Sequence, residues 1–90
     1  MCKVREFVIK NEFGIHARPA SKFVQIASDY ESDVNVHNLT LGATANGRSI
    51  MSMLTLAAAK GHVIKLEIDG SDEDQLMLAL AELIESGFEE

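Results

Sequence analysis

The chain has 90 residues, of which 47% are hydrophobic and 24% charged, a length and composition typical of one small globular domain. Plentiful aliphatic residues and a single proline exclude a disordered chain, and no apolar run approaches the roughly 20 residues of a membrane span. The only cysteine, Cys2, leaves no partner for an internal disulfide or a cysteine-based zinc cluster. The charged opening of the chain is unlike a signal peptide, so we expect one cytoplasmic domain over residues 1–90.

The net charge of −6 is distributed unevenly along the chain. Residues 1–65 hold eight bases and five acids, a net charge of +3, whereas residues 66–90 hold nine acids and no base. So few bases are too weak for sequence-independent nucleic-acid binding, and the acidic end argues against DNA and anionic membranes as partners. A bipolar surface of this kind suits protein partners or a small anion. A solubilising acidic tail is the alternative interpretation.

In chain order, Val4 to Ile9 predicts a short strand with imperfect alternation of apolar residues. Ala17 to Ser28 predicts a helix, because its apolar residues recur three and four positions apart: Ala20, Phe23, Val24 and Ala27. Pro19 lies in the first turn of that helix, where a missing N–H costs nothing. Residues 29–33 are a polar linker.

Residues 34–38 predict a second strand, and residues 39–46 predict a hairpin whose register the sequence does not fix. Asn46-Gly47 is typical of a turn. A second helix is expected from Ser49 to about Ala59, ended by Lys60-Gly61.

The clearest strand is His62 to Asp69, whose central apolar residues alternate: Ile64, Leu66 and Ile68. Gly70 turns the chain, and Ser71 is the expected N-cap of a last helix with acids in its first turn. That helix carries one apolar stripe and is expected to stop at Gly87: Leu76, Met77, Leu80, Leu83 and Ile84. The order β-α-β-β-α-β-α predicts an α+β domain with helices on one face of a mainly antiparallel sheet.

His16 has the most informative neighbours of the three histidines. It immediately precedes the first predicted helix, whose unpaired N–H groups and dipole form an anion site. Arg18 adds a planar cation suited to a phosphate, and Gly14 leaves the preceding loop free to bend. A histidine placed there can act as a nucleophile that takes up a phosphoryl group. The alternative is a histidine that only caps the helix, with a solvated Arg18.

A second candidate site begins at Ser49. Serine is favoured at a helix N-cap without any further function, yet a phosphate there would also meet a favourable dipole. In the following residues, Ile50, Met53 and Leu54 can share one helical stripe while Met51 points elsewhere. Exposed Met and Ile side chains suit a surface that adapts to several partners. An ordinary amphipathic helix explains the same pattern.

The other histidines, His37 and His62, lie at or near strand ends, and we interpret both as surface residues without chemistry. No pair of histidines has the spacing of a metal site, and no acidic partner stands in a ligand motif. We therefore expect no metal and no cofactor.

The segment from Gly14 to Ala20 (GIHARPA) resembles the active-site signature of the HPr family, the histidine-containing phosphocarriers of the bacterial phosphoenolpyruvate:sugar phosphotransferase system. Arg48 to Met51, with Met53, Leu56 and Ala57 following, resembles that family's second signature, around a regulatory serine. The similarity covers nearly the whole chain. It implies an open-faced β-sandwich with four strands and three helices in the order predicted above.

The resemblance also implies roles for individual residues. His16 would be phosphorylated on Nδ1 by phospho-enzyme I and would pass the group to IIA domains of sugar transporters. Arg18 and the N–H groups of Ala17 and Arg18 would hold the phosphoryl group. Ser49 would be the serine that an HPr kinase/phosphorylase modifies in some bacteria, with transcriptional regulators as further partners. Three residues would form the docking surface for enzyme I and IIA: Ile50, Met51 and Leu54.

The resemblance implies a monomeric carrier without turnover of its own.

Two features of the chain depart from the family pattern. Residues 37–46 are longer than the usual tight hairpin and lack its Asn-Gly turn, and residues 85–90 resemble the nitrogen-branch paralogue NPr. The residues after Ser49 resemble the sugar-branch carrier more closely, but both branches remain possible. Two further interpretations also remain possible: a regulatory binding module with little phosphotransfer, and a small domain that holds a free anion.

Overall fold

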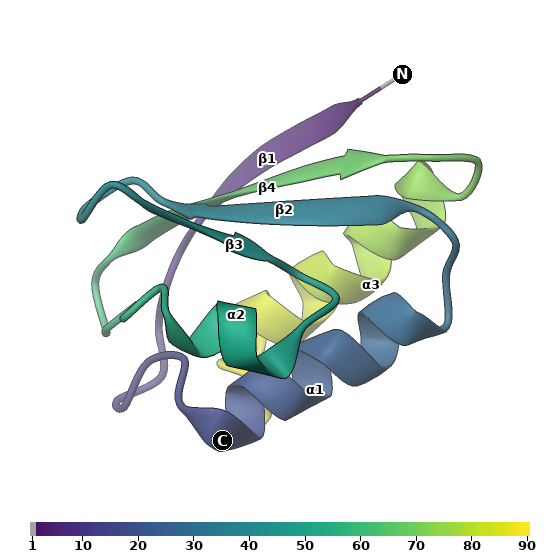
Figure 1. Cartoon of the computed structure of the whole chain (residues 1–90). Helices are drawn as coiled ribbons and strands as arrows, with labels where there is room; N and C mark the ends of the chain where they lie inside the picture. Colours follow the sequence, from purple (N-terminus) through teal and green to yellow (C-terminus); the bar gives the residue numbers. More distant parts are fainter. Residues whose placement is uncertain (1) are drawn as a thin grey trace.

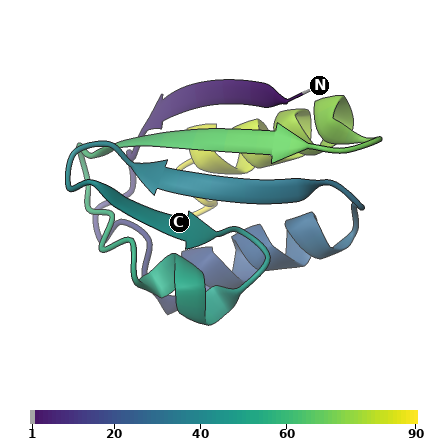
Figure 2. The same ribbon diagram turned by 45° about the horizontal axis from the view of Figure 1, so that its top comes forward.

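The computed structural model describes residues 2–90, and Met1 lies outside the described residues. Seven elements follow one another: β1 (Lys3–Val8), α1 (Ala17–Ser28), β2 (Asp33–Asn38), β3 (Ala43–Asn46), α2 (Ile50–Leu54), β4 (Val63–Asp69) and α3 (Glu73–Glu85). The strands form one sheet in the order β1-β4-β2-β3, and every pairing is antiparallel. All three helices lie on the same side of this sheet (Figures 1 and 2). The predicted α+β class, element order and open-faced β-sandwich are therefore confirmed.

The core lies between the sheet and the helices, and the alternation of strand residues creates it. On β4, the apolar side chains of Ile64, Leu66 and Ile68 are fully buried, while the residues between them face the open side of the sheet. The predicted stripe of α3 is buried against the same layer, as are Phe23 and Ala27 of α1. Within residues 2–90, no helix has the length and hydropathy needed to cross a membrane.

The hairpin that the sequence left without a register is set by one buried side chain. His37 of β2 pairs with Thr44 of β3, and residues 39–42 connect the two strands. Asn38 is 1% exposed, and its side-chain oxygen accepts hydrogen bonds from the backbone N–H groups of Thr40 and Leu41. Because a side chain closes the turn, this connection needs no Asn-Gly pair.

The second helix is much shorter than the sequence predicts. It was expected to run from Ser49 to about Ala59, but α2 ends at Leu54. Leu56 and Ala58 are both buried while Ala57 between them is exposed, a spacing that a continuing helix would not produce. Ala57 takes a left-handed conformation with φ 49°, which breaks the helix. Burial of two apolar side chains in the core thus overrides the local helix propensity.

The N-cap of α3 is Asp72, so the expectation for Ser71 is wrong. The Asp72 carboxylate makes no capping bond. It accepts hydrogen bonds from the backbone N–H groups of Glu31 and Ser32 and from the Ser32 hydroxyl. The hydroxyl bond is the main reason that the pKa of Asp72 is lowered, followed by the backbone bond from Glu31. This carboxylate ties the start of α3 to the connection between α1 and β2.

The chain after α3 returns to the body of the protein through a Schellman motif. The N–H of Phe88 bonds to the carbonyl of Leu83, and the N–H of Gly87 bonds to that of Ile84. Gly87 adopts the left-handed conformation that this motif requires, with φ 70°. The ring of Phe88 is fully buried. Residues 86–90 are therefore fixed beside α1, although their composition indicates a solvated acidic end.

The two halves of unequal charge pair with one another in the folded chain. Lys3 contacts Asp74 of α3 at 3.1 Å, and Arg5 contacts Glu85 at 3.4 Å. Each pair is exposed, so its contribution to stability is small. The bipolar surface expected from the sequence is thus partly neutralised along α3.

Phe88→Ala tests whether the end of the chain is part of the core. We expect a loss of about 3–5 kcal/mol in the free energy of unfolding, because a fully buried ring leaves a cavity. Phe13→Ala is the matched control, since the Phe13 ring is 78% exposed and its removal should change stability by about 0.5 kcal/mol or less. Urea unfolding of both variants measures the difference. Equal effects would show that Phe88 does not anchor the chain.

Candidate functional site

His16 occupies the N-cap position of α1, with extended backbone angles (φ −95°, ψ −166°). Its carbonyl accepts the N–H of Ala20 at 3.0 Å, which starts the helix, but its ring makes no capping bond. Helix geometry leaves the N–H groups of Ala17 and Arg18 without an intrahelical acceptor, and Pro19 has none to satisfy. The helix thus begins where the sequence predicts: His16 is the N-cap residue, but its side chain does no capping.

The position of His16 depends on a close approach between two loops. The N–H of Ile15 donates to the carbonyl of Ala58 at 2.8 Å. Gly14 has φ 63°, and a Cβ there would lie 2.1 Å from the same Ala58 oxygen. Asn11 closes the loop from the other side, since its amide donates to the Gly14 carbonyl at 2.6 Å. Only glycine fits at this point, so Gly14 is a packing requirement as well as a bend.

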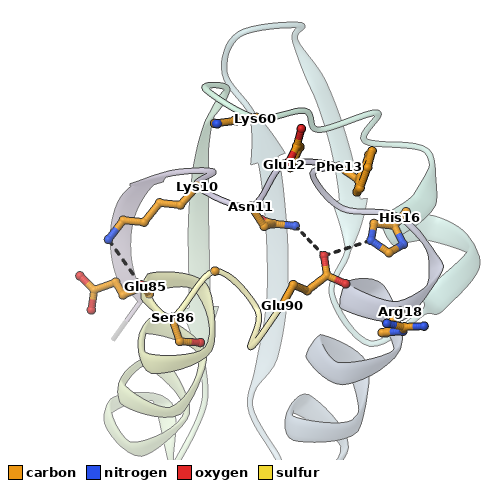
Figure 3. Close-up of a pocket in the computed structure, with 11 residues that line it drawn as sticks. Lys10, Asn11, Glu12, Phe13, His16, Arg18, Lys60, Glu85, Ser86 and Glu90 are labelled. Carbon is orange, nitrogen blue, oxygen red and sulfur yellow. Dashed lines mark hydrogen bonds and ion pairs between the residues drawn. The ribbon is translucent and has the colours of Figure 1, made fainter.

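The His16 ring contacts two side chains, Glu90 and Phe13, which are labelled beside it in Figure 3. Its Nε2 lies 3.1 Å from Oε1 of Glu90, and the same oxygen accepts the Asn11 amide at 3.2 Å. The Phe13 ring meets the imidazole edge-on, with 6.4 Å between ring centroids. Within residues 2–90, no hydrogen bond reaches Nδ1. The His16 side chain is 41% exposed.

The Glu90 carboxylate is held in its charged form by its surroundings. Burial alone would raise the pKa of Glu90, but the hydrogen bonds from His16 and Asn11 and the charges of His16 and Arg18 together lower it. Its side chain is 19% exposed. An ionised carboxylate therefore lies directly against the ring.

A cleft of about 730 Å³ opens beside the ring. Its lining mixes bases and acids with the polar side chains of two loops: Lys10, Asn11, Glu12, Phe13, His16, Arg18, Lys60, Glu85, Ser86, Gly87 and Glu90. Arg18 points into solvent at the start of α1 (Figure 3). The site can therefore receive an anion on His16 without displacing any core residue.

Ser49 is the N-cap of α2, and its hydroxyl oxygen accepts the N–H of Ser52 at 3.2 Å. Of the three residues predicted to share a stripe, Met53 is fully buried, whereas Ile50 and Leu54 are only partly covered, and Met51 points elsewhere as predicted. The other apolar side chains of this short helix are exposed: Ile50 by 39%, Met51 by 76% and Leu54 by 37%. The five-residue helix points one side chain inward and leaves three outward, next to α1.

The remaining histidines take part in local hydrogen bonds. His37 bonds to the Thr44 hydroxyl through Nδ1 and to the Glu67 carboxylate through Nε2, and this second bond is the main reason that the pKa of Glu67 is lowered. His62 accepts the N–H of Ala59 through Nδ1. Both lie at or near strand ends as expected, partly exposed, with their rings in local hydrogen bonds. No group of metal-ligating side chains occurs among residues 2–90.

Sequence reasoning missed three residues of this site: Asn11, Phe13 and Glu90. Glu90 lies 74 positions from His16 in the sequence, inside a run of acids that indicates a solvated end. No local pattern links such distant residues, because the fold of the segment after α3 brings them together.

Comparisons with known proteins agree on one family. A family model described as "PTS HPr component phosphorylation site" matches residues 3–86. The chain is 49% identical over 82 residues to a phosphocarrier protein HPr of Neisseria meningitidis serogroup A, which covers 91% of this chain and 90% of that protein. It is 40% identical over 86 residues to a multiphosphoryl transfer protein of Escherichia coli O157:H7, where it spans only 23% of the longer protein. The crystal structure of HPr-C-His from Thermoanaerobacter tengcongensis matches with a TM-score of 0.89 and 42% identity, covering 98% of this chain and 97% of that one.

The lowered pKa of Glu90 allows a test of its contact with the ring. In His16→Ala the hydrogen bond and the charge of the ring are lost, so the pKa of Glu90 should rise. Because the pKa of Glu90 is lower in the folded state, the contact stabilises the folded state above the unfolded pKa. That stabilisation is lost as the pH falls through the folded pKa. Carbon-13 NMR titration of the carboxyl groups measures both states.

Glu67 is an internal control in the same spectra, because its lowered pKa depends on His37. It should not change in His16→Ala. A Glu90 pKa that also stays constant would contradict the contact.

Proposed function

This chain belongs to the HPr family of phosphocarrier proteins of the phosphotransferase system, and on that premise we propose that Nδ1 of His16 accepts and donates the phosphoryl group. The donor is phospho-enzyme I and the acceptors are IIA domains of sugar transporters, in the cytoplasm. The observation that supports this proposal is an imidazole nitrogen without a hydrogen-bond partner among residues 2–90, on a side chain that is 41% exposed and stands at the start of a helix.

The first turn of α1 suits the charge that arrives with the phosphoryl group. The N–H groups of Ala17 and Arg18 are unpaired, and they lie at the positive end of a 12-residue helix. Hydrogen bonds to an anion at this place cost no rearrangement, because the helix already fixes the donors. The backbone would thus hold the group on His16 while leaving it open to attack by the next protein.

Arg18 would add a planar cation to these amides. Its side chain is exposed and makes no hydrogen bond or ion pair within residues 2–90. A guanidinium free of other partners can follow the phosphoryl oxygens during transfer in both directions. A carrier must bind its phosphoryl group neither too loosely nor too tightly. One exposed guanidinium and two backbone amides would bind the group more weakly than a site that surrounds it with donors.

The partners would dock on the apolar surface of α2. Ile50, Met51 and Leu54 are exposed together, and Met side chains adapt to differently shaped partners. Such a surface, small and adjacent to His16's helix, suits short-lived complexes. The same surface would serve every partner in turn. Because each half of the cycle needs a donor or an acceptor protein, the chain would have no turnover of its own.

The sugar branch is our first choice, and the nitrogen branch is the second, because residues 85–90 resemble the paralogue NPr. Incubation with phosphoenolpyruvate and enzyme I of each branch, followed by intact-mass measurement, separates them.

The label should depend on His16 alone. Incubation with phosphoenolpyruvate and enzyme I should add one phosphoryl group that is acid-labile and base-stable, as a phosphoramidate is. His16→Ala should abolish labelling. His37→Ala and His62→Ala are matched controls that should keep it, because His37 lies within β2 and His62 directly before β4, and neither stands at a helix start. Mass spectrometry of each variant measures the outcome, and a labelled His16→Ala would refute the proposal.

Phosphorylation of Ser49 should block docking. It would add about −1.5 to −2 charges beside an apolar surface, where a dianion must be desolvated or is repelled. We expect Ser49→Asp to fold but to accept the phosphoryl group more slowly, with a smaller effect than genuine phosphorylation. Ser49→Ala should transfer as the unmodified chain does and lose about 1 kcal/mol of stability with its cap.

Ser71→Asp is the control for added charge, since it follows β4 at the end of the molecule away from the loop before α1 (Figure 1). It should transfer normally. Stopped-flow transfer from phospho-enzyme I, repeated at higher salt, shows whether repulsion contributes. Equal rates for the unmodified chain, Ser49→Asp and phosphorylated Ser49 would leave this serine as a helix cap only.

A further inference from the structure

We propose that Glu90 is a positioning residue for phosphotransfer: its carboxylate holds the ring proton of His16 on Nε2 and leaves Nδ1 as the unprotonated nucleophile. This inference rests on the proposed function of His16 and adds a residue that no sequence motif includes.

The tautomer follows from the chemistry of the two partners. An ionised carboxylate only accepts hydrogen bonds, so the 3.1 Å contact between Nε2 and Oε1 requires the proton on Nε2. A neutral imidazole carries one ring proton, and Nδ1 therefore keeps its lone pair. The amide of Asn11 donates to the same oxygen at 3.2 Å and restrains it. The carboxylate touches the nitrogen opposite the acceptor and leaves the acceptor position open.

The segment that carries Glu90 is held by independent contacts. Phe88 is fully buried, and its carbonyl accepts the Lys22 ammonium at 2.8 Å. Phe88 and Glu89 both adopt left-handed conformations, with φ 59° and 62°. Such conformations are unfavourable for residues with a Cβ and persist only where the surrounding structure imposes them. The fold thus accepts a local cost and places the Glu90 side chain on the ring.

The charge of Glu90 matters during the transfer as well as before it. A bond forms between Nδ1 and phosphorus while the bond from phosphorus to the donor breaks, and that electron pair stays on the donor atom. The Nε2 proton remains in place, so the ring becomes a cation that the adjacent carboxylate stabilises. In the reverse step the ring leaves as a neutral imidazole. Glu90 therefore assists both directions through His16, as an acidic partner does for a metal-bound or catalytic histidine.

The other charges around this contact do not replace it. Arg18 lies at the helix start, Lys22 is engaged by the carbonyl of Phe88, and Lys10 donates to the Glu85 carbonyl. Lys60 and Glu12 line the cleft without a bond to the ring. The Glu90 carboxylate is the acid in contact with His16 among residues 2–90.

Glu90→Ala and Glu90→Gln separate the two effects of the carboxylate. The glutamine oxygen can still accept the Nε2 proton but has no charge, whereas alanine removes both. Nitrogen-15 NMR of the His16 ring at about pH 8.5, where free imidazole is neutral, reads the tautomer directly. The unmodified chain and Glu90→Gln should show the proton on Nε2, and Glu90→Ala should show a measurable Nδ1–H population.

Single-turnover transfer into and out of His16 is the second measurement. Glu90→Ala should be slower in both directions by about 10- to 100-fold, by analogy with carboxylates that orient metal-binding histidines. Glu90→Gln should lie between it and the unmodified chain. Glu89→Gln is the matched control, because that carboxylate lies 3.9 Å from Lys22 and does not contact the ring. It should leave the tautomer and the rates unchanged.

An unchanged tautomer, or unchanged or faster transfer, in a folded Glu90→Ala would overturn the inference. Thermal unfolding of each variant establishes that it is folded, and the isosteric Glu90→Gln preserves the packing. Failure of the proposed function would give a different result. The unmodified chain would then take no phosphoryl label on His16, whereas nitrogen-15 NMR would still report the tautomer of its ring.

Discussion

The approach of the loop before α1 to the carbonyl of Ala58 is the constraint on which the site depends. A single backbone bond of 2.8 Å from Ile15 fixes where the helix begins, and Gly14 is the residue that permits it. The early end of α2 serves the same contact, because Ala57 must turn the chain for Ala58 to present its oxygen. This one contact between loops therefore positions both the first helix and the second, and with them the exposed apolar side chains of α2.

A phosphocarrier must combine a rigid backbone with an open side chain, and this fold separates the two requirements. The core side chains of β4, β2 and α3 are fully buried and give the helix start a fixed place. The His16 ring itself is 41% exposed and is oriented by a few polar contacts. The neighbouring backbone N–H groups of the helix start are held by the helix itself, so an anion bound there would require no ordering of side chains.

The acids near the end of the chain have different partners in the folded protein, and their effects differ accordingly. Its acids pair with bases of the first half at the ends of α3, where Asp74 meets Lys3 and Glu85 meets Arg5. Exposed pairs of this kind add little to stability. Glu90 differs because the buried Phe88 ring anchors the segment that places its carboxylate, 19% exposed, against the His16 ring.

The sequence alone determined the element order, the exact span of α1 and the place of His16 before it, because helix periodicity and the proline in the first turn are local properties. The alternation of Ile64, Leu66 and Ile68 likewise identified the central strand. Only the tertiary structure decided where α2 ends, which residue caps α3, and that Glu90 meets His16. Each of these outcomes rests on contacts between residues far apart in the chain, where the burial of apolar side chains and the pairing of polar groups outweigh local preference.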